Sequence, residues 1–140
     1  MAKLACYYFD TDSNFEVAGF VVDEEFKSVD VLEGLPVVKS SWASSKFPSS
    51  EYSMFVALSY SGMNHLRSEK CAWARASGYR LVSYVSSRAT TFGDLSHGDN
   101  CLILEDNTVQ PFVTLGNNVD RKSTRLNSSH VSESRMPSSA

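Results

Sequence analysis

Residues 85–120 read VSSRAT TFGDLS HGDNCL ILEDNT VQPFVT LGNNVD when the chain is written in groups of six. The first positions of these hexads are Val85, Thr91, His97, Ile103, Val109 and Leu115. The fifth positions are Ala89, Leu95, Cys101, Asn107, Val113 and Val119. Four of the six first positions are aliphatic, which is typical of a left-handed parallel β-helix whose triangular coils direct one side chain per side inward. The period predicts that residues 84–119 form two such coils.

The same segment repeats itself at a longer offset. The sequence GDNC at residues 98–101 recurs as GNNV at residues 116–119, eighteen residues later. Three hexads make one coil, so these two segments should stack on each other. We expect their glycines to supply unusual backbone dihedral angles at the corners. We also expect one shared interior for Val85, Ile103, Val109, Leu115 and Val119.

Upstream of residue 84 the pattern changes to strands that alternate with helices, which is typical of a small parallel α/β sheet. Apolar, β-rich runs predict buried strands at residues 16–22, 54–58 and 81–85. A turn followed by a short extended segment is predicted at residues 34–38.

Two helices are predicted in this half of the chain. The inner face of the first, residues 2–9, is expected to carry Leu4, Tyr7 and Tyr8. The inner face of the second, which begins at residue 63, is expected to carry Leu66, Trp73 and Ala74. Its other side carries Arg67, Glu69, Lys70 and Arg75. Ser77 and Gly78 are predicted to end this helix as a C-cap.

A doubly wound domain normally opens with a strand and a glycine-rich turn before its first helix. This chain begins in the predicted helix at residues 2–9. We therefore expect Met1 to be an internal methionine, with the first strand and the phosphate-binding glycine loop lying upstream of the printed sequence. The fold expected for residues 1–83 is accordingly a partial, Rossmann-like domain.

The last twenty residues differ in composition from the rest of the chain. Residues 121–140 contain seven serines and only four apolar residues, too few to offset the entropy of ordering them. The sequences DRKSTRLNSSH (residues 120–130) and SRMPSSA (134–140) resemble the in-frame translation of a short-read sequencing adapter. We expect residues 120–140 to be a disordered, non-native tail that does not pack against residues 1–119. The chain is thus expected to be truncated at both ends.

Composition argues against several classes of protein. The 140 residues carry a net charge of −3, which does not favour a general electrostatic attraction to nucleic acid. No apolar run approaches the roughly 18 residues of a transmembrane helix, and the N-terminus lacks the layout of a signal peptide. The spacing of Cys6, Cys71 and Cys101 fits neither a disulfide framework nor a zinc site. We expect a cytoplasmic protein that binds neither nucleic acid nor membrane.

Four segments carry a family resemblance: FEVAGFVVD (residues 15–23), GLPVV (34–38), MFVALSYSGMNHLRSEK (54–70) and GDNCLILEDNTVQPFVTLGNNV (98–119). Together they resemble the sugar O-acyltransferases of the sialic-acid O-acetyltransferase family, a group that includes bacterial acetyltransferases of UDP-linked amino sugars. The resemblance covers residues 2–119. It implies a fragment of an enzyme that moves an acetyl group from acetyl-CoA to a hydroxyl or amine of a sugar or nucleotide-linked amino sugar.

The resemblance also implies a homotrimer in which coenzyme A lies in a groove between neighbouring subunits. A histidine on the β-helix, made more basic by a nearby carboxylate, would deprotonate the acceptor, and hydrogen-bond donors would stabilise the oxyanion. In the family this histidine follows the segment that matches residues 116–119, so we expect no catalytic base in this chain and no activity from it as written. We expect His65 to be a solvated helix residue and His97 to be a core residue. His130 belongs to the predicted tail.

The nucleotide-linked sugar is expected at the carboxyl ends of the N-terminal strands. By resemblance, Asp23 and Glu24 hold the nucleoside, since a carboxylate there can accept hydrogen bonds from ribose hydroxyls. Two solvated carboxylates at a strand end explain the same pair equally well. The other predicted binding residues are Ser59, which stands where the family often has a glycine, and Tyr60, Ser61 and Asn64.

Two other functions stay open on the sequence. Hexapeptide coils without a base could serve as a trimerisation scaffold, with the α/β half acting as a non-catalytic nucleotide-binding module. A histidine with a neighbouring acid in the next coil would indicate a transferase instead. A metal-dependent β-helix hydratase needs three convergent histidine ligands, whereas His65 and His97 fall in different predicted domains. No metal site is predicted.

Overall fold

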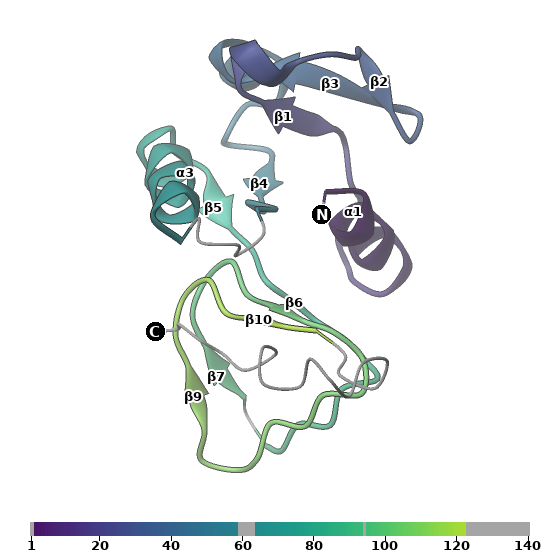
Figure 1. Cartoon of the computed structure of the whole chain (residues 1–140), viewed down its shortest axis with the longest axis vertical. Coiled ribbons are helices and arrows are strands. Elements are labelled where there is room, and N and C mark those ends of the chain that lie inside the picture. The colour runs from purple at the N-terminus through teal and green to yellow at the C-terminus, as the bar shows by residue number, and fades with distance from the viewer. Residues whose placement is uncertain (1, 59–63, 94, 123–140) are drawn as a thin grey trace. The chain divides into compact units, whose positions relative to one another are not determined.

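The computed structural model of this chain describes residues 2–58, 64–93 and 95–122. The chain divides into two compact units, residues 1–80 and residues 81–140. Among the described residues, all helices lie in the first unit, and short strands in mostly parallel pairs occur in both (Figure 1). The fold is therefore a mixed α/β one with small parallel sheets, as the alternation of strand and helix patterns predicts.

The main sheet of the first unit has the order β1-β3-β2. Strand β1 (Phe20–Val22) runs parallel to β3 (Leu35–Lys39), with Phe20 opposite Val37 and Val22 opposite Lys39. Strand β2 (Val31–Leu32) is antiparallel to β3 and joins it through Glu33 and Gly34. Both turn residues have positive φ (53° and 78°), the combination that a two-residue hairpin of type I′ requires. The predicted turn and extended segment at 34–38 are confirmed.

The strand predicted at residues 16–22 is shorter than expected, because only residues 20–22 join the sheet. The backbone N–H of Val17 donates instead to the Asp10 carboxylate (2.9 Å), which fixes this part of the chain beside the end of α1. Gly19 then allows a close approach, since a Cβ there would lie 2.6 Å from the Phe47 ring and 2.8 Å from the Pro36 carbonyl oxygen. The apolar run thus divides between a connecting segment and a strand.

Helix α1 (Ala2–Thr11) forms where it is predicted but buries a different face. Its buried residues are Ala5, Cys6 and Phe9, whereas Leu4 and Tyr7 of the predicted face are 39% and 63% exposed. The Phe9 ring decides the orientation, because it packs against the rings of Phe15 (6.1 Å between centroids) and Phe55 (5.2 Å). The helical period is correct and the choice of face is wrong.

Helix α3 (Asn64–Ala76) ends as predicted. Gly78 has a φ of 94°, its N–H donates to the Arg75 carbonyl (2.9 Å), and the Tyr79 N–H donates to the Ala74 carbonyl (2.9 Å). These two bonds define a Schellman motif, which needs a residue in the left-handed region. Arg67 is an exception to the predicted faces: it is 1% exposed, and its guanidinium donates to the Leu58 carbonyl (3.3 Å).

The remaining elements of the first unit are short. They are η1 (Glu24–Phe26), η2 (Ser40–Trp42), α2 (Ala43–Lys46) and β4 (Ser53–Met54), which pairs with β5 (Arg80–Leu81). Of the strand predicted at 54–58, only residue 54 lies in a strand, and the strand predicted at 81–85 is split between β5 and β6.

The second unit is organised by a constant offset of eighteen residues. Strand β6 (Tyr84–Val85) pairs in parallel with β8 (Leu102–Ile103), which pairs with β10 (Asp120–Arg121). Strand β7 (Ser96–His97) pairs in parallel with β9 (Thr114–Leu115), and a parallel bridge joins Thr90 to Thr108. Every partner lies eighteen residues further along the chain, so the chain returns to the same place once per three hexads (Figure 1).

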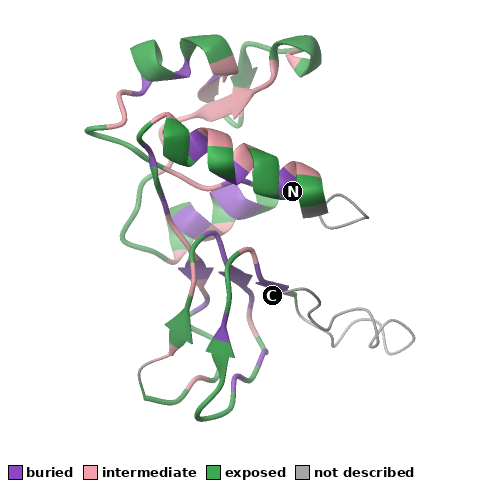
Figure 2. Cartoon of the chain, turned by 90° about the vertical axis from the view of Figure 1, so that its left-hand side faces the viewer, coloured by how far each residue is buried: buried purple, intermediate pink, exposed green. Residues whose placement is uncertain are grey.

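The interior of this unit follows the hexad pattern with two exceptions. Ile103, Leu115, Cys101 and Val119 form one buried cluster, against which Val85, Ala89 and Leu95 pack, and Val109 is also buried. Figure 2 shows in purple where buried residues lie along the chain. The prediction that His97 is a core residue is wrong, since this residue is exposed. Val113, at a fifth hexad position, is exposed as well. An imidazole in this apolar interior would need hydrogen-bond partners that the surrounding carbon atoms do not offer.

Among the described residues of the second unit, Gly93 has a positive φ (57°), and four residues other than glycine have one as well. Positive φ values occur at Asn100 (58°), Asp106 (63°), Phe112 (71°) and Asn118 (61°), six residues apart at the fourth hexad position. Asparagine and aspartate tolerate the left-handed region better than other residues with a Cβ. Gly98 does not have a positive φ; a Cβ there would instead lie 2.8 Å from the backbone N of Asn117. The glycine is needed for close approach, which corrects the predicted role.

Polar side chains join the two GDNC-like segments across the coils. The Asn100 amide donates to the Asn118 side-chain oxygen (3.1 Å), and the Asp99 N–H donates to the Asn117 side-chain oxygen (2.7 Å). The Asn118 N–H in turn donates a hydrogen bond to the Asp99 carbonyl (2.9 Å). The stacking of residues 98–101 on 116–119 is therefore as predicted.

The parallel strand pairing continues past the predicted boundary at residue 120. Asp120 and Arg121 form β10, and the Arg121 carbonyl accepts hydrogen bonds from the Leu104 N–H (2.8 Å) and the Asn107 side-chain amide (2.9 Å). The expectation that Arg121 does not pack against residues 1–119 is wrong, because backbone groups can complete a parallel ladder whatever the side chains are. Residues 123–140, the rest of the predicted tail, lie outside the described residues.

Replacing Ile103 by alanine should lower the free energy of unfolding by about 2–5 kcal/mol, because the side chain is fully buried in the coil interior. The matched control is Val113→Ala at a 40% exposed position, where the change should stay below about 0.5 kcal/mol. Urea denaturation followed by circular dichroism measures both variants. Equal effects would contradict the buried interior.

Replacing Phe112 by asparagine should raise the free energy of unfolding by roughly 0.5–1 kcal/mol, because asparagine adopts the left-handed region at lower cost. The Phe112 side chain is fully exposed, so little packing is lost. Val113→Asn, one residue on at a position without positive φ, is the control and should give no gain. A loss of stability in Phe112→Asn would refute the argument.

Candidate functional site

The carboxyl ends of β1 and β3 meet at one edge of the first unit's sheet. Val22 is opposite Lys39 in the parallel register, so Asp23 and Ser40 leave the sheet next to each other. Each strand leads directly into a short 3-10 helix, η1 after Asp23 and η2 at Ser40 (Figure 1). Open parallel sheets bind ligands at this edge, which makes it the candidate site of the first unit.

The carboxylate of Asp23 is held by a lysine from a distant part of the chain. The Lys70 Nζ lies 2.7 Å from Oδ1 and 2.5 Å from Oδ2 of Asp23, and the two side chains are 33% and 27% exposed. Asp23 is also the N-cap residue of η1, yet its side chain makes no capping hydrogen bond. The sequence analysis placed Lys70 on the side of α3 opposite its predicted inner face and did not predict this ion pair. The two residues are 47 positions apart, and no local sequence pattern indicates such a contact.

Glu24 is exposed in the first turn of η1 and does not take part in this ion pair. The next cation along the chain, Lys27, pairs with Asp30. The hydrogen bond from Lys27, together with its charge, holds the pKa of the Asp30 carboxyl below its ordinary value. Of the two predicted nucleoside-binding carboxylates, the structure therefore brings only Asp23 into a defined contact.

The structure gives no side-chain contacts for the other predicted binding residues. Ser59, Tyr60 and Ser61 lie outside the described residues. Asn64 is the first residue of α3, and only its backbone position is described.

Neither described histidine has the surroundings of a general base. His65 is exposed on α3, which confirms its prediction as a solvated helix residue. His97 is exposed in β7, and its Nδ1 lies 2.8 Å from the carbonyl oxygen of Gly98. Among the described residues no carboxylate bonds to either ring, whereas a base of this kind is normally oriented and made more basic by such a partner. His130 lies outside the described residues.

Nucleophilic and metal chemistry find little support in the part of the chain that the structure describes. Cys6, Cys71 and Cys101 are all buried. Burial and, secondarily, the nearby Asp10 raise the pKa of the Cys6 thiol, so it stays protonated at neutral pH. The Cys101 thiol lies 3.1 Å from the Gly116 carbonyl oxygen inside the coils. No group of three potential metal ligands occurs among these residues.

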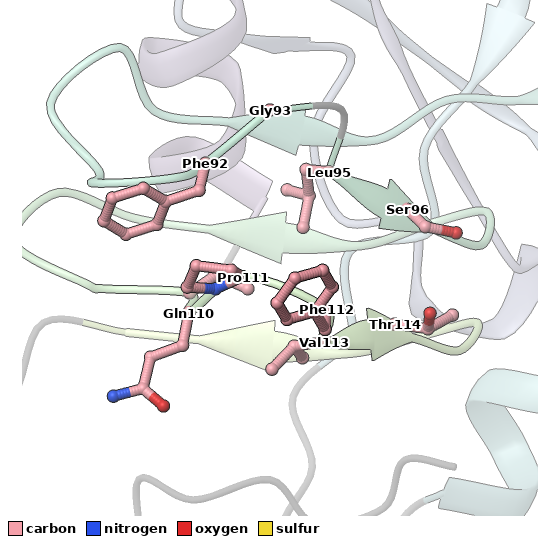
Figure 3. A pocket seen from close by; sticks show the side chains of 10 residues that line it. Phe92, Gly93, Leu95, Ser96, Gln110, Pro111, Phe112, Val113 and Thr114 are labelled. Atoms are coloured by element: carbon pink, nitrogen blue, oxygen red, sulfur yellow. The ribbon is translucent and has the colours of Figure 1, made fainter.

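A cavity of about 330 Å³ opens on the second unit. Figure 3 shows its apolar lining from Phe92, Leu95, Pro111, Phe112 and Val113, with Gln110, Ser96 and Thr114 at its polar margin. No charged side chain of the described residues lines it. The described residues that line it include no acid, base or thiol, unlike those at the charged edge of the first unit.

Neither α1 nor α3, the two longest helices of the described residues, has the length and apolar content needed to cross a membrane.

No protein-family model matches the sequence, and no curated protein matches it. Solved structures from Caulobacter crescentus are similar in fold. A mutant of perosamine N-acetyltransferase in complex with CoA and GDP-perosamine gives a TM-score of 0.58 at 19% identity, over 74% of this chain and 60% of that one. A second mutant with the same ligands gives 0.60 at 19% identity, over 76% and 61%. PerB with CoA and GDP-perosamine gives 0.56 at 20% identity, over 72% and 58%.

At sequence identities of 19% to 20%, the similarity to these structures is evidence about the fold alone. It supports the same mixed α/β architecture with small parallel sheets that the sequence predicts. The chain spans about 60% of the length of these neighbours.

Replacing His97 by alanine should change the free energy of unfolding by less than about 0.5 kcal/mol, because the ring is exposed and its hydrogen bond is to the carbonyl of the neighbouring Gly98. His65→Ala, another exposed histidine, is the matched control. Thermal denaturation measures both variants. A loss of more than about 2 kcal/mol in His97→Ala alone would restore the prediction of a core histidine.

Proposed function

We propose that this chain is part of an acetyl-CoA-dependent acetyltransferase that acts on a sugar or a nucleotide-linked amino sugar. The observation that carries the proposal is the succession of a small parallel α/β unit and parallel strands repeated every eighteen residues. The neighbours with this fold are sugar acetyltransferases solved with CoA and GDP-perosamine. They support a sugar acetyltransferase in general; membership of the sialic-acid O-acetyltransferase family remains a prediction.

The finer architecture belongs to the same proposal. Residues 84 onward would be the start of a left-handed parallel β-helix of hexapeptide repeats, and residues 1–83 a partial Rossmann-like domain. The three ladders, at residues 84–85, 90 and 96–97, lie six residues apart, which fits the three sides of a triangular coil. The homotrimer with coenzyme A in a groove between neighbouring subunits, which the resemblance implies, belongs to the same proposal.

The nucleotide-linked sugar would bind at the carboxyl edge of β1 and β3. Asp23 offers carboxylate oxygens there, and Glu24 is exposed in the following turn. Ser59, Tyr60 and Ser61, which lie between β4 and α3 in the sequence, and Asn64, the first residue of α3, stay in the proposal as further binding residues. In this arrangement the first unit selects the acceptor and the coils hold the acetyl donor.

The reaction itself needs a base that removes a proton from the acceptor hydroxyl or amine before it attacks the thioester. His65 and His97 have no carboxylate partner among the described residues. We propose that the base follows Val119 in a later coil, as the resemblance implies, and that the 140 residues alone do not turn over. General acid–base catalysis is typically responsible for about 10²–10⁴-fold in rate.

The test measures thiol release from acetyl-CoA with a panel of nucleotide-linked amino sugars. It compares the 140-residue chain with the same chain continued through the next coils of its natural reading frame. We expect no turnover above background by the former and turnover by the latter, since only the latter would carry the base and complete the groove for coenzyme A.

His97→Ala in both forms is the internal control. Turnover by the 140-residue chain that disappears in His97→Ala would identify His97 as the base and refute the proposed location. Nucleotide-sugar binding without turnover in the continued form would favour the alternative of a non-catalytic nucleotide-binding and trimerisation scaffold.

A further inference from the structure

We propose that Lys70 is a positioning residue for Asp23 and that it allows this strand end to accept the diphosphate of a nucleotide-linked sugar. The inference rests on the proposed function and adds to it a residue that acts through Asp23. It starts from the geometry of the ion pair between α3 and the end of β1.

The pair leaves hydrogen-bonding capacity on both partners. Lys70 Nζ contacts both carboxylate oxygens of Asp23, at 2.7 and 2.5 Å, and this two-point contact fixes the plane of the carboxylate. A carboxylate has about four acceptor positions and an ammonium has three donors, so roughly two acceptors and one donor stay available beside each other. The pair can therefore accept hydrogen bonds from ribose hydroxyls and donate one to an anionic oxygen.

The carboxylate is not needed for the local fold of η1. An aspartate at an N-cap normally accepts a hydrogen bond from the first turn, whereas the side chain of Asp23 makes none. Lys70 therefore directs this carboxylate away from the backbone that follows it. Because both side chains are about two-thirds buried or more, solvent screens their interaction less than it would on an open surface.

Charge gives the second reason for the lysine. Asp23, Glu24 and Glu25 follow one another at the strand end, and a nucleoside diphosphate brings further negative charge. Of the other cations, Lys27 pairs with Asp30, Arg67 donates to the Leu58 carbonyl, and Lys39 is exposed at the carboxyl end of β3. Lys70 compensates the charge of Asp23, and its loss would set a bare carboxylate against the diphosphate. Repulsion of this kind at roughly 6 Å and a dielectric constant between those of water and a protein surface corresponds to about tenfold in affinity.

A purely structural role makes a different prediction. If the pair only attached α3 to β1, its loss would weaken binding of a nucleoside and of its diphosphate by the same factor. If Lys70 compensates charge, the diphosphate loses more. The ratio of the two affinities is therefore the deciding quantity.

The experiment measures binding of uridine, UDP, guanosine and GDP to the full 140-residue chain by isothermal titration calorimetry at low salt. In Lys70→Met we expect the diphosphates to lose about tenfold more affinity than the nucleosides. Lys70→Arg should keep the wild-type ratio within about threefold, because it retains the charge and the contact. The double variant Asp23→Asn, Lys70→Met should recover the diphosphate preference, since it removes the uncompensated charge.

Lys3→Met is the matched control for net charge. Lys3 also forms an ion pair, with Glu33 (3.3 Å), and Glu33 precedes β3, at the opposite end of that strand from Lys39. Lys3→Met should leave the affinities for the nucleosides and for the diphosphates unchanged. Circular dichroism measures whether each variant is folded. If Lys70→Met unfolds, the comparison is made with the double variant, which buries no unpaired charge.

Equal losses for nucleoside and diphosphate in Lys70→Met, or no loss at all, would overturn this inference and leave the proposed function standing. Absence of binding of all four compounds by the wild-type chain would overturn this inference, and the turnover assay on the continued chain would decide the proposed function separately. Loss confined to the diphosphates, reversed in the double variant, would support the role of Lys70.

Discussion

The parallel pairing of backbone at a fixed offset of eighteen residues is the constraint on which the second unit depends. The Ser86 N–H donates to the Ile103 carbonyl and the Leu104 N–H to the Arg121 carbonyl, both at 2.8 Å. A chain that must return to its own edge after eighteen residues has to turn corners at fixed intervals. That requirement accounts for the left-handed residues at positions 100, 106, 112 and 118. It also directs Ile103, Leu115 and Val119 into one interior.

A similar backbone constraint prepares the candidate site in the first unit. Parallel pairing of β1 with β3 brings Asp23 next to Ser40 at one edge of the sheet. Helix α3, closed by its Schellman motif at Gly78, then supplies Lys70 to the Asp23 carboxylate. The sheet provides the location and the helix provides the charge, so the chemistry of the edge arises from elements 47 residues apart. The proposed recognition of a nucleotide-linked sugar depends on both.

For helix α1 and for His97, the predicted period was correct and the predicted environment was not. Helix α1 has the predicted extent to within two residues, but the Phe9 ring contacts with Phe15 and Phe55 select a different face. His97 occupies a first hexad position and is nevertheless exposed, because an apolar interior cannot satisfy an imidazole. The corner signal was present in the sequence as Asn100, Asp106 and Asn118, each a residue type that tolerates positive φ, and it was assigned to glycine instead.

The sequence by itself determined the strand–helix alternation, the six-residue period, the stacking of residues 98–101 on 116–119 and the end of α3 at Gly78. These features depend on local propensities and regular spacing, which a linear pattern contains. Only the tertiary structure decided the burial of Arg67, the inclusion of Asp120 and Arg121 in a strand, and the ion pair of Asp23 with Lys70. Each of these is a contact between residues far apart in sequence, or a backbone bond that any side chain permits. Nothing in local spacing specifies such contacts, because they follow from how the elements pack.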